Sequence, residues 1–146
     1  MSAPKFFSEE DKKEISAAIT KAEEHTRGEI RVFVEKKCKG DVMKRAVKIF
    51  HQLKMHKTQH RTGVLIYVAH DDHQLAIIGD KSIHEKVQQE FWDQVKDEML
   101  SHFSEGKFVL GMKHAIARSG AELKKHFPAD GENPNELSNE VVVSEK

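Results

Sequence analysis

Carboxylates in two regions of the chain have the chemistry to hold a metal ion. Glu29 precedes one predicted strand, Asp80 follows another, and Asp71 and Asp72 stand together in a predicted turn. Ca²⁺ and Mg²⁺ take carboxylate, carbonyl and water oxygens at exposed loops. The sequence therefore predicts a divalent-cation site, with Glu29 and Asp80 close together at one end of a sheet and Asp71 and Asp72 near Glu35 at the opposite end. Two ordinary roles stay open, because aspartates favour turns and an acidic residue complements a helix N-terminus.

The histidines, ten in all, do not form a known metal motif. His56 and His60 are four residues apart but lack the glutamate of H-E-x-x-H, and we read His70 and His73, which flank the turn aspartates, as exposed polar residues. Those two still offer nitrogen ligands to zinc or nickel. EF-hand spacing, a Walker loop, Gly-x-Gly-x-x-Gly and Gly-x-Ser-x-Gly are all absent. The usual NTPase, dinucleotide-binding and α/β-hydrolase classes are therefore excluded.

Composition narrows the classes of partner. The 24 basic and 24 acidic residues cancel, so no overall field attracts nucleic acid or anionic lipid. Cys38 is the single cysteine, which excludes an intramolecular disulfide. No apolar run reaches the roughly 20 residues of a membrane span, and the N-terminus has no apolar signal core. We expect a soluble, cytoplasmic monomer without nucleic-acid or membrane partners.

The elements that must position these residues centre on two short apolar runs. Val64–Ala69 and Leu75–Ile78 flank the turn at residues 70–73, which predicts a β-hairpin. Successive apolar residues in the first run indicate burial on both faces. Ile30–Glu35 alternates apolar and polar residues, which predicts a less buried strand. A right-handed crossover makes this strand parallel to the first run, so the fold class is α/β: a small mixed sheet, a parallel pair plus an antiparallel hairpin strand, sandwiched between helices.

Apolar residues at spacings of three and four predict four helices. They begin at Ser8, at Asp41, at Ser82 and at Phe108, and the first ends near His25 and the last at Phe127 before Pro128. Residues 1–7 form an N-terminal tail and residues 8–127 a single α/β domain. Residues 128–146 are rich in Gly, Asn, Pro, Ser and Glu, which predicts a disordered C-terminal tail.

Four motifs in order resemble the TPM domain, which occurs in a plant thylakoid lumen protein of photosystem II repair and in many bacterial membrane-anchored proteins. The motifs are Thr-Arg-Gly-Glu-Ile-Arg-Val at 26–32, Arg-Thr-Gly-Val-Leu-Ile-Tyr-Val at 61–68, Ala-Ile-Ile-Gly-Asp-Lys-Ser-Ile at 76–83 and Phe-Trp-Asp at 91–93. The similarity covers about residues 6–127 and is greatest to short bacterial members that lack a signal and an anchor. It implies an α/β sandwich, an acidic cluster for a divalent cation, often calcium, and an acid phosphatase activity.

The resemblance carries two acidic positions over to this chain, Glu29 after Thr-x-Gly and Asp80 after Gly79. Arg61, Thr62 and Gly63 lie alongside them. Where membrane-bound members commonly carry Gly-Tyr-Gly, this chain has Gly-Asp-Lys at 79–81. The partner functions of the membrane-bound members are therefore not carried over to this chain. The candidate metal ligands are Glu29, Asp80, Asp71, Asp72 and Asp93, with Glu90 as a further candidate.

Three functions remain open. We predict a TPM-like domain that binds a divalent cation, Ca²⁺ or else Mg²⁺ or another ion, through its acidic cluster. The first alternative is a metal-dependent acid phosphatase, in which the metal polarises a phosphoryl oxygen and a carboxylate positions water or attacks. The chain lacks the Asp-x-Asp and Cys-x5-Arg nucleophile loops of other phosphatases. The second alternative is a metal-free protein-interaction module that uses the last helix or the hairpin, with an unknown protein partner.

Overall fold

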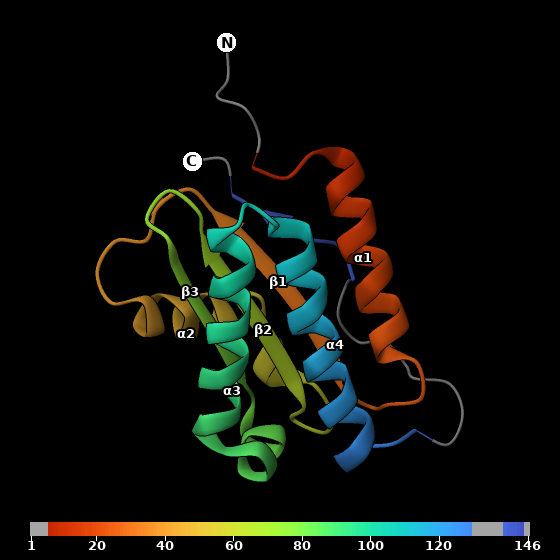
Figure 1. Ribbon diagram of the computed structural model, residues 1–146. Helices are drawn as coiled ribbons and strands as arrows, with labels where there is room; N and C mark the ends of the chain where they lie inside the picture. The colour runs from red at the N-terminus through yellow and green to blue at the C-terminus, as the bar shows by residue number, and fades with distance from the viewer. Residues whose placement is uncertain (1–5, 130–138, 145–146) are drawn as a thin grey trace.

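A small mixed sheet between helices forms the frame of the molecule (Figure 1). The computed structural model describes residues 6–129 and 139–144. Within these residues the strand order is β3-β2-β1-β4, and the predicted α/β class is confirmed. The elements are α1 (Glu9–Glu23), β1 (Glu29–Glu35), α2 (Val42–Gln52), the short 3-10 helix η1 (Met55–Lys57), β2 (Gly63–Ala69), β3 (Gln74–Gly79), α3 (Lys81–Ser104), α4 (Phe108–His126) and β4 (Val142–Val143).

The parallel pair and the hairpin form as the apolar pattern predicts. β1 and β2 run parallel from the pair Glu29 and Gly63 to the pair Glu35 and Ala69. β3 lies antiparallel on the other side of β2. The loops that follow β1 and β2 therefore begin at the same end of the sheet, where both strands have their carboxyl ends.

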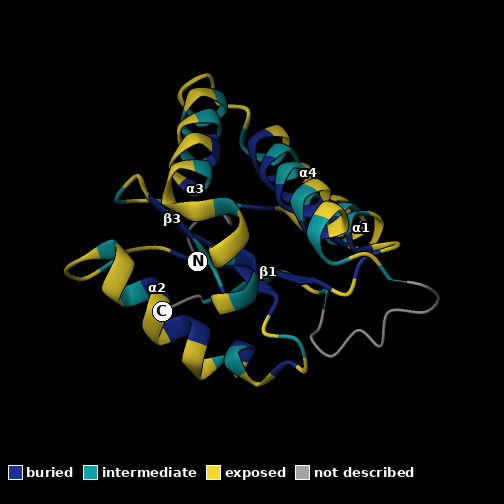
Figure 2. Ribbon diagram, turned by 90° about the horizontal axis from the view of Figure 1, so that it is seen from below, coloured by how far each residue is buried: buried dark blue, intermediate teal, exposed yellow. Residues whose placement is uncertain are grey.

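Helices cover both faces of the sheet. α1, α3 and α4 lie on one face and α2 on the other (Figure 2). All seven residues of β2 are buried: Val64, Ile66 and Val68 pack into the first apolar cluster, while Leu65, Tyr67 and Ala69 pack into the second. A strand buried in this way reads as a continuous apolar run, as the sequence does.

β4 departs from the disordered tail predicted for residues 128–146. Val142 and Val143 pair in parallel with Phe33 and Val34 of β1, and the amide of Ser144 donates to the carbonyl of Val34 at 2.8 Å. For residues 139–144 the prediction was wrong, because this short apolar stretch completes the open edge of β1. Residues 130–138 and 145–146 lie outside the described part of the chain, as do residues 1–5 of the predicted N-terminal tail.

β1 is more buried than its alternating sequence predicts. It lies between β2 and β4, and Arg31 alone among its seven residues is not fully buried. Even Glu29 and Glu35, at its two ends, are only 1% and 7% exposed. The prediction of a less buried strand was wrong because the polar residues of β1 are covered by neighbouring elements.

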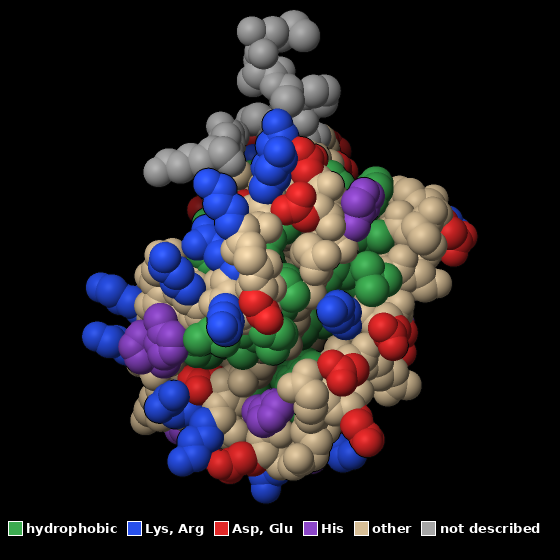
Figure 3. All heavy atoms as spheres, turned by 90° about the vertical axis from the view of Figure 1, so that its left-hand side faces the viewer, with side chains coloured by type: hydrophobic (Ala, Val, Ile, Leu, Met, Phe, Trp, Pro, Cys, Tyr) green, Lys and Arg blue, Asp and Glu red, His purple; other side chains and the backbone are tan. Residues whose placement is uncertain are grey.

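β3 is an edge strand, yet its backbone is well covered. Leu75, Ala76 and Ile77 are at most 3% exposed, because α2 and α3 flank the strand on its two faces. Such cover protects an edge strand from pairing with other chains. On this side of the molecule, hydrophobic side chains gather in a hollow that is surrounded by charged ones (Figure 3).

The helix termini follow local capping chemistry. Ser8 and Asp11 form a capping box at the start of α1, and Asp41 caps α2, both as predicted. α3 starts earlier than predicted, because Asp80 rather than Ser82 is its N-cap. α3 is also interrupted at Gln88, where the backbone adopts φ 67° and ψ 168°. None of the described helices combines the length and the apolar character needed to cross a membrane.

The close contact of β3 with α3 leads to a stability prediction. A Cβ atom on Gly79 would lie 2.5 Å from Cζ2 of Trp92 and 2.9 Å from Cγ2 of Ile83. Gly79→Ala should therefore lower the free energy of unfolding by about 1–3 kcal/mol, measured by urea denaturation. Gly63→Ala is the matched control, because its Cβ would approach no atom closer than 3.4 Å. Equal stability of Gly79→Ala and wild type would contradict this packing.

Candidate functional site

Glu29 and Asp80 both lie at the amino end of the parallel strands. Glu29 is the register partner of Gly63, and the amide of Asp80 donates to the carbonyl of Gly63 at 2.8 Å. The two residues thus flank the first residue of β2 from opposite sides. Both residues therefore lie at the same end of the sheet.

The carboxylate of Asp80 is already fully engaged. It accepts hydrogen bonds from Nε of Arg61 at 2.8 Å, from Nη2 of Arg61 at 3.0 Å and from the amide of Lys81 at 2.7 Å. These hydrogen bonds and the negative charge of Asp80 raise the pKa of Arg61. Asp80 therefore caps α3 and anchors Arg61, whose backbone is held in the left-handed region at φ 54°.

Glu29 lies near a second buried acid, Glu23, at the end of α1. Glu23 is 5% exposed, and its Oε2 accepts a hydrogen bond from the amide of Ile30 at 2.8 Å. Burial raises the pKa of Glu23 to about 8, and the charge of Glu29 adds to the shift. Glu23 was missed from the sequence because it reads as one more surface charge on a highly charged helix.

The predicted acidic cluster does not form at this end. In the described part of the chain, no three His, Cys, Asp or Glu side chains converge as they would around a metal ion. The guanidinium of Arg61 pairs with the carboxylate of Asp80, and the charge of Glu29 contributes to the raised pKa of Glu23. Asp93 stands apart on the exposed surface of α3, where it accepts a hydrogen bond from Nε2 of Gln89 at 2.9 Å.

Asp71 and Asp72 lie at the carboxyl end of the parallel strands, beside the loop that joins β1 to α2. The amide of Asp71 donates to the carbonyl of Lys36 at 2.8 Å. In the other direction, the amide of Cys38 donates to Oδ2 of Asp72 at 2.7 Å. The hairpin turn and the β1–α2 loop are thus joined directly.

A buried ionic network lies at this same end of the sheet. Glu35 accepts hydrogen bonds from Nε and Nη2 of Arg45, at 2.8 and 2.9 Å, and from the hydroxyl of Tyr67. Burial alone would raise the pKa of Glu35, but the bonds from Arg45 and Tyr67 outweigh it and hold the pKa below its usual value. Burial, with Glu35, raises the pKa of Tyr67. The charged Glu35 therefore ties β1, β2 and α2 together.

This network was missed from the sequence because its three members come from three elements. Tyr67 reads as one of several buried apolar residues in β2, and Arg45 as a surface charge of α2. The alternation along β1 shows only that Glu35 shares a face with Phe33. A buried carboxylate that needs a cation becomes evident only once α2 is placed on that face.

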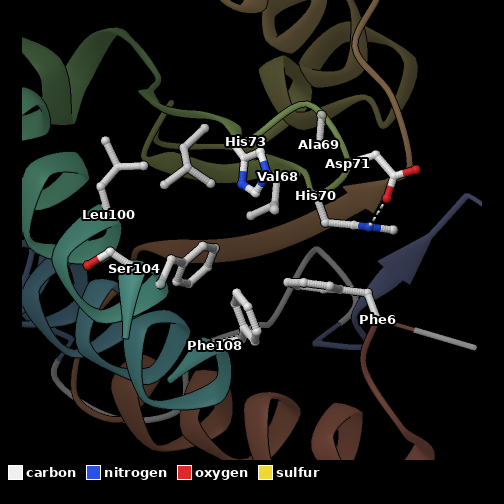
Figure 4. A pocket seen from close by; sticks show the side chains of 11 residues that line it. Phe6, Val68, Ala69, His70, Asp71, His73, Leu100, Ser104 and Phe108 are labelled. Carbon is white, nitrogen blue, oxygen red and sulfur yellow. Dashed lines mark ion pairs between the residues drawn. The ribbon is translucent and has the colours of Figure 1, made fainter. Parts of the chain in front are cut away.

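A cavity of about 630 Å³ lies beside the hairpin turn. Figure 4 shows His70, Asp71 and His73 on one side of it, with the ion pair between Nδ1 of His70 and Oδ1 of Asp71 at 3.1 Å. Phe6, from the segment before α1, stacks on the ring of His70. Besides Ser104, the rest of the wall is made of apolar side chains: Val68, Ala69, Leu75, Leu100, Phe103 and Phe108.

The raised pKa of Glu23 predicts a pH-dependent stability. The unfolded chain loses this proton near its usual value of 4.5, whereas the folded protein keeps it up to about pH 8. The folded state binds more protons in that window, so stability from this group is complete below pH 4.5 and is lost as pH rises to about 8. Glu23→Gln should reduce that loss by roughly 1 kcal/mol or more, measured by urea unfolding at about pH 5 and about pH 8.

Glu10→Gln on the exposed side of the same helix is the control for this experiment, and it should keep the wild-type pH dependence. The same decline in Glu23→Gln as in wild type would show that Glu23 does not hold the proton.

Comparison with known proteins assigns the chain to a family. The model of the TPM domain matches residues 2–122. No curated protein matches the chain. The solved structure of the BA42 protein from the psychrophilic bacterium Bizionia argentinensis is 39% identical, with 98% of this chain and 99% of that chain covered and a TM-score of 0.89. The N-terminal domain of the cg2496 protein from Corynebacterium glutamicum shares the fold at 14% identity, with 80% and 74% covered and a TM-score of 0.63. The chain therefore belongs to the TPM domain family.

Proposed function

We propose that this TPM domain binds a divalent cation, Ca²⁺ in the first place, at the carboxyl end of β1 and β2. Asp71 and Asp72 of the hairpin turn supply the carboxylates. The observation that carries the proposal is the direct hydrogen bonding of this turn to the β1–α2 loop, which places both turn aspartates beside that loop. Ligands of open α/β sheets bind outside the carboxyl ends of the strands.

The amino end of the sheet is less suited to a cation. Asp80 is bound by the guanidinium of Arg61, so a metal there would have to displace a resident positive charge. Glu23, beside Glu29, has a pKa of about 8 and keeps its proton near neutral pH. At the carboxyl end, the side chain of Asp71 is 39% exposed, with Nδ1 of His70 at 3.1 Å and Nζ of Lys36 at 4.0 Å. Its carboxylate is accessible from solvent.

The number of charged ligands determines the affinity for Ca²⁺ that we expect. No third acidic or histidine side chain among the described residues converges on the two aspartates. Ca²⁺ takes six to eight oxygens, and backbone carbonyls and water can supply those that carboxylates do not. Backbone oxygens of the turn and the loop would therefore complete the shell. A site with so few charged ligands should bind weakly, with a Kd on the order of 10⁻⁴–10⁻³ M.

The other two functions, a metal-dependent phosphatase and a metal-free interaction module, remain predictions. A phosphatase would need the bound cation as its electrophile, so cation binding comes first for that function too. A metal-free interaction module would show no response to Ca²⁺. The same titration therefore bears on all three functions.

Isothermal titration of Ca²⁺ into matched variants tests the proposal. Asp71→Asn with Asp72→Asn should weaken binding at least about tenfold, because the substitution removes both charged ligands while keeping the shape of the turn. Asp93→Asn is the matched control on the exposed surface of α3 and should leave the affinity unchanged.

Asp80→Asn distinguishes the two ends of the sheet. It should lower the melting temperature, because it weakens the cap of α3 and the pair with Arg61, but leave calcium affinity unchanged. Loss of binding in Asp80→Asn, together with wild-type binding in the Asp71 and Asp72 double variant, would refute a site at the carboxyl end.

A further inference from the structure

The ring of Phe6 forms part of the wall of the cavity beside the hairpin turn. This ring stacks on His70 with a centroid distance of 4.5 Å and an interplanar angle of 5°. The ring of Phe108 lies 4.7 Å from it on a tilted plane, and Figure 4 shows Phe6 between the two. The cavity therefore provides both a stacking surface and an edge contact, the arrangement that aromatic rings prefer.

Phe6 lies at the border of the core, and its ring meets that of Phe7 edge-on at a centroid distance of 4.6 Å. The next residue, Phe7, is only 2% exposed and packs within the core cluster, whereas Phe6 is partly buried at the border of that cluster. Ser8 then caps α1. Phe7 and the cap of α1 thus anchor this segment on the helix side of Phe6.

The chemistry of the wall restricts what can take its place. Beyond Phe6 the cavity extends over about 630 Å³, which is ample for a small molecule. Its polar groups, from His70, Asp71, His73 and Ser104, lie beside an otherwise apolar wall. None of the described lining residues is a lysine or an arginine, so the wall itself offers no permanent positive charge to an anion.

We propose that this cavity is a binding site for a small, uncharged aromatic molecule, whose ring stacks on His70 in the place that Phe6 takes. Phe6 is the resident occupant, and the ligand replaces it. The site adjoins the proposed cation site, because Asp71 lines the cavity and contacts His70, but its binding contacts come from the stacking surface and the apolar wall rather than from the carboxylates of the turn.

Competition with Phe6 makes the site measurable. A ligand that binds only when Phe6 has left the cavity shows an apparent affinity reduced by the fraction of molecules in that state. Phe6→Ala removes the competitor and keeps Phe7 and the cap of α1. It should therefore tighten binding by about three- to tenfold.

Indole is a suitable probe, because it is planar, uncharged and small. Titration of indole into the full chain, followed by amide chemical shifts, should perturb His70, Ser104 and Phe108, with a lower Kd in Phe6→Ala than in wild type. Ser104→Trp should weaken binding at least about fivefold in the Phe6→Ala background, because Ser104 is exposed at the cavity rim and the new ring would fill the space.

Leu110→Ala is the control. Leu110 is 51% exposed on α4 and lines a different groove, so its loss should leave the Kd for indole unchanged. The proposal is overturned if Phe6→Ala binds indole no more tightly than wild type, if the folded Ser104→Trp variant binds it equally well, or if the perturbed amides lie around Leu110 instead.

Discussion

The burial of β2 on both faces is the constraint on which the rest of the structure depends. Six of its seven residues, all but Gly63, send side chains alternately into two apolar clusters, so helices must cover both faces of the sheet. β1 is brought alongside in parallel through the crossover that contains α2. The two parallel strands then end together at Glu35 and Ala69, and the loops after them meet. The candidate site is a consequence of that shared edge.

The buried acids at the two ends of this sheet are held in opposite protonation states. Glu35 is held charged, because Arg45 and the Tyr67 hydroxyl bond its carboxylate. Glu23, at the other end, holds its proton to about pH 8, because burial outweighs its hydrogen bonds. Asp80, also at the amino end, is paired with Arg61. The carboxyl end keeps its turn aspartates beside solvent and beside the aromatic cavity.

Local patterns were sufficient to predict most of the fold. The apolar run at residues 64–69 predicted β2, and Ser8 and Asp41 predicted two helix starts, because these signals are complete within a few residues. β4 was missed because two valines in a polar tail become a strand only through pairing with β1. The site was harder to predict. The strand register places Glu29 and Asp80 at one end of the sheet, but it does not show that the carboxylate of Asp80 forms an ion pair with Arg61.

A calcium titration followed through the backbone amide resonances tests most directly which end of the sheet carries the ligand chemistry. Binding at the carboxyl end predicts the largest shifts within residues 36–41 and 70–73, with little change around Gly63 and Lys81. The largest shifts at residues 27–30, 61–63 and 80–82, or no saturable shifts at millimolar calcium, would contradict it.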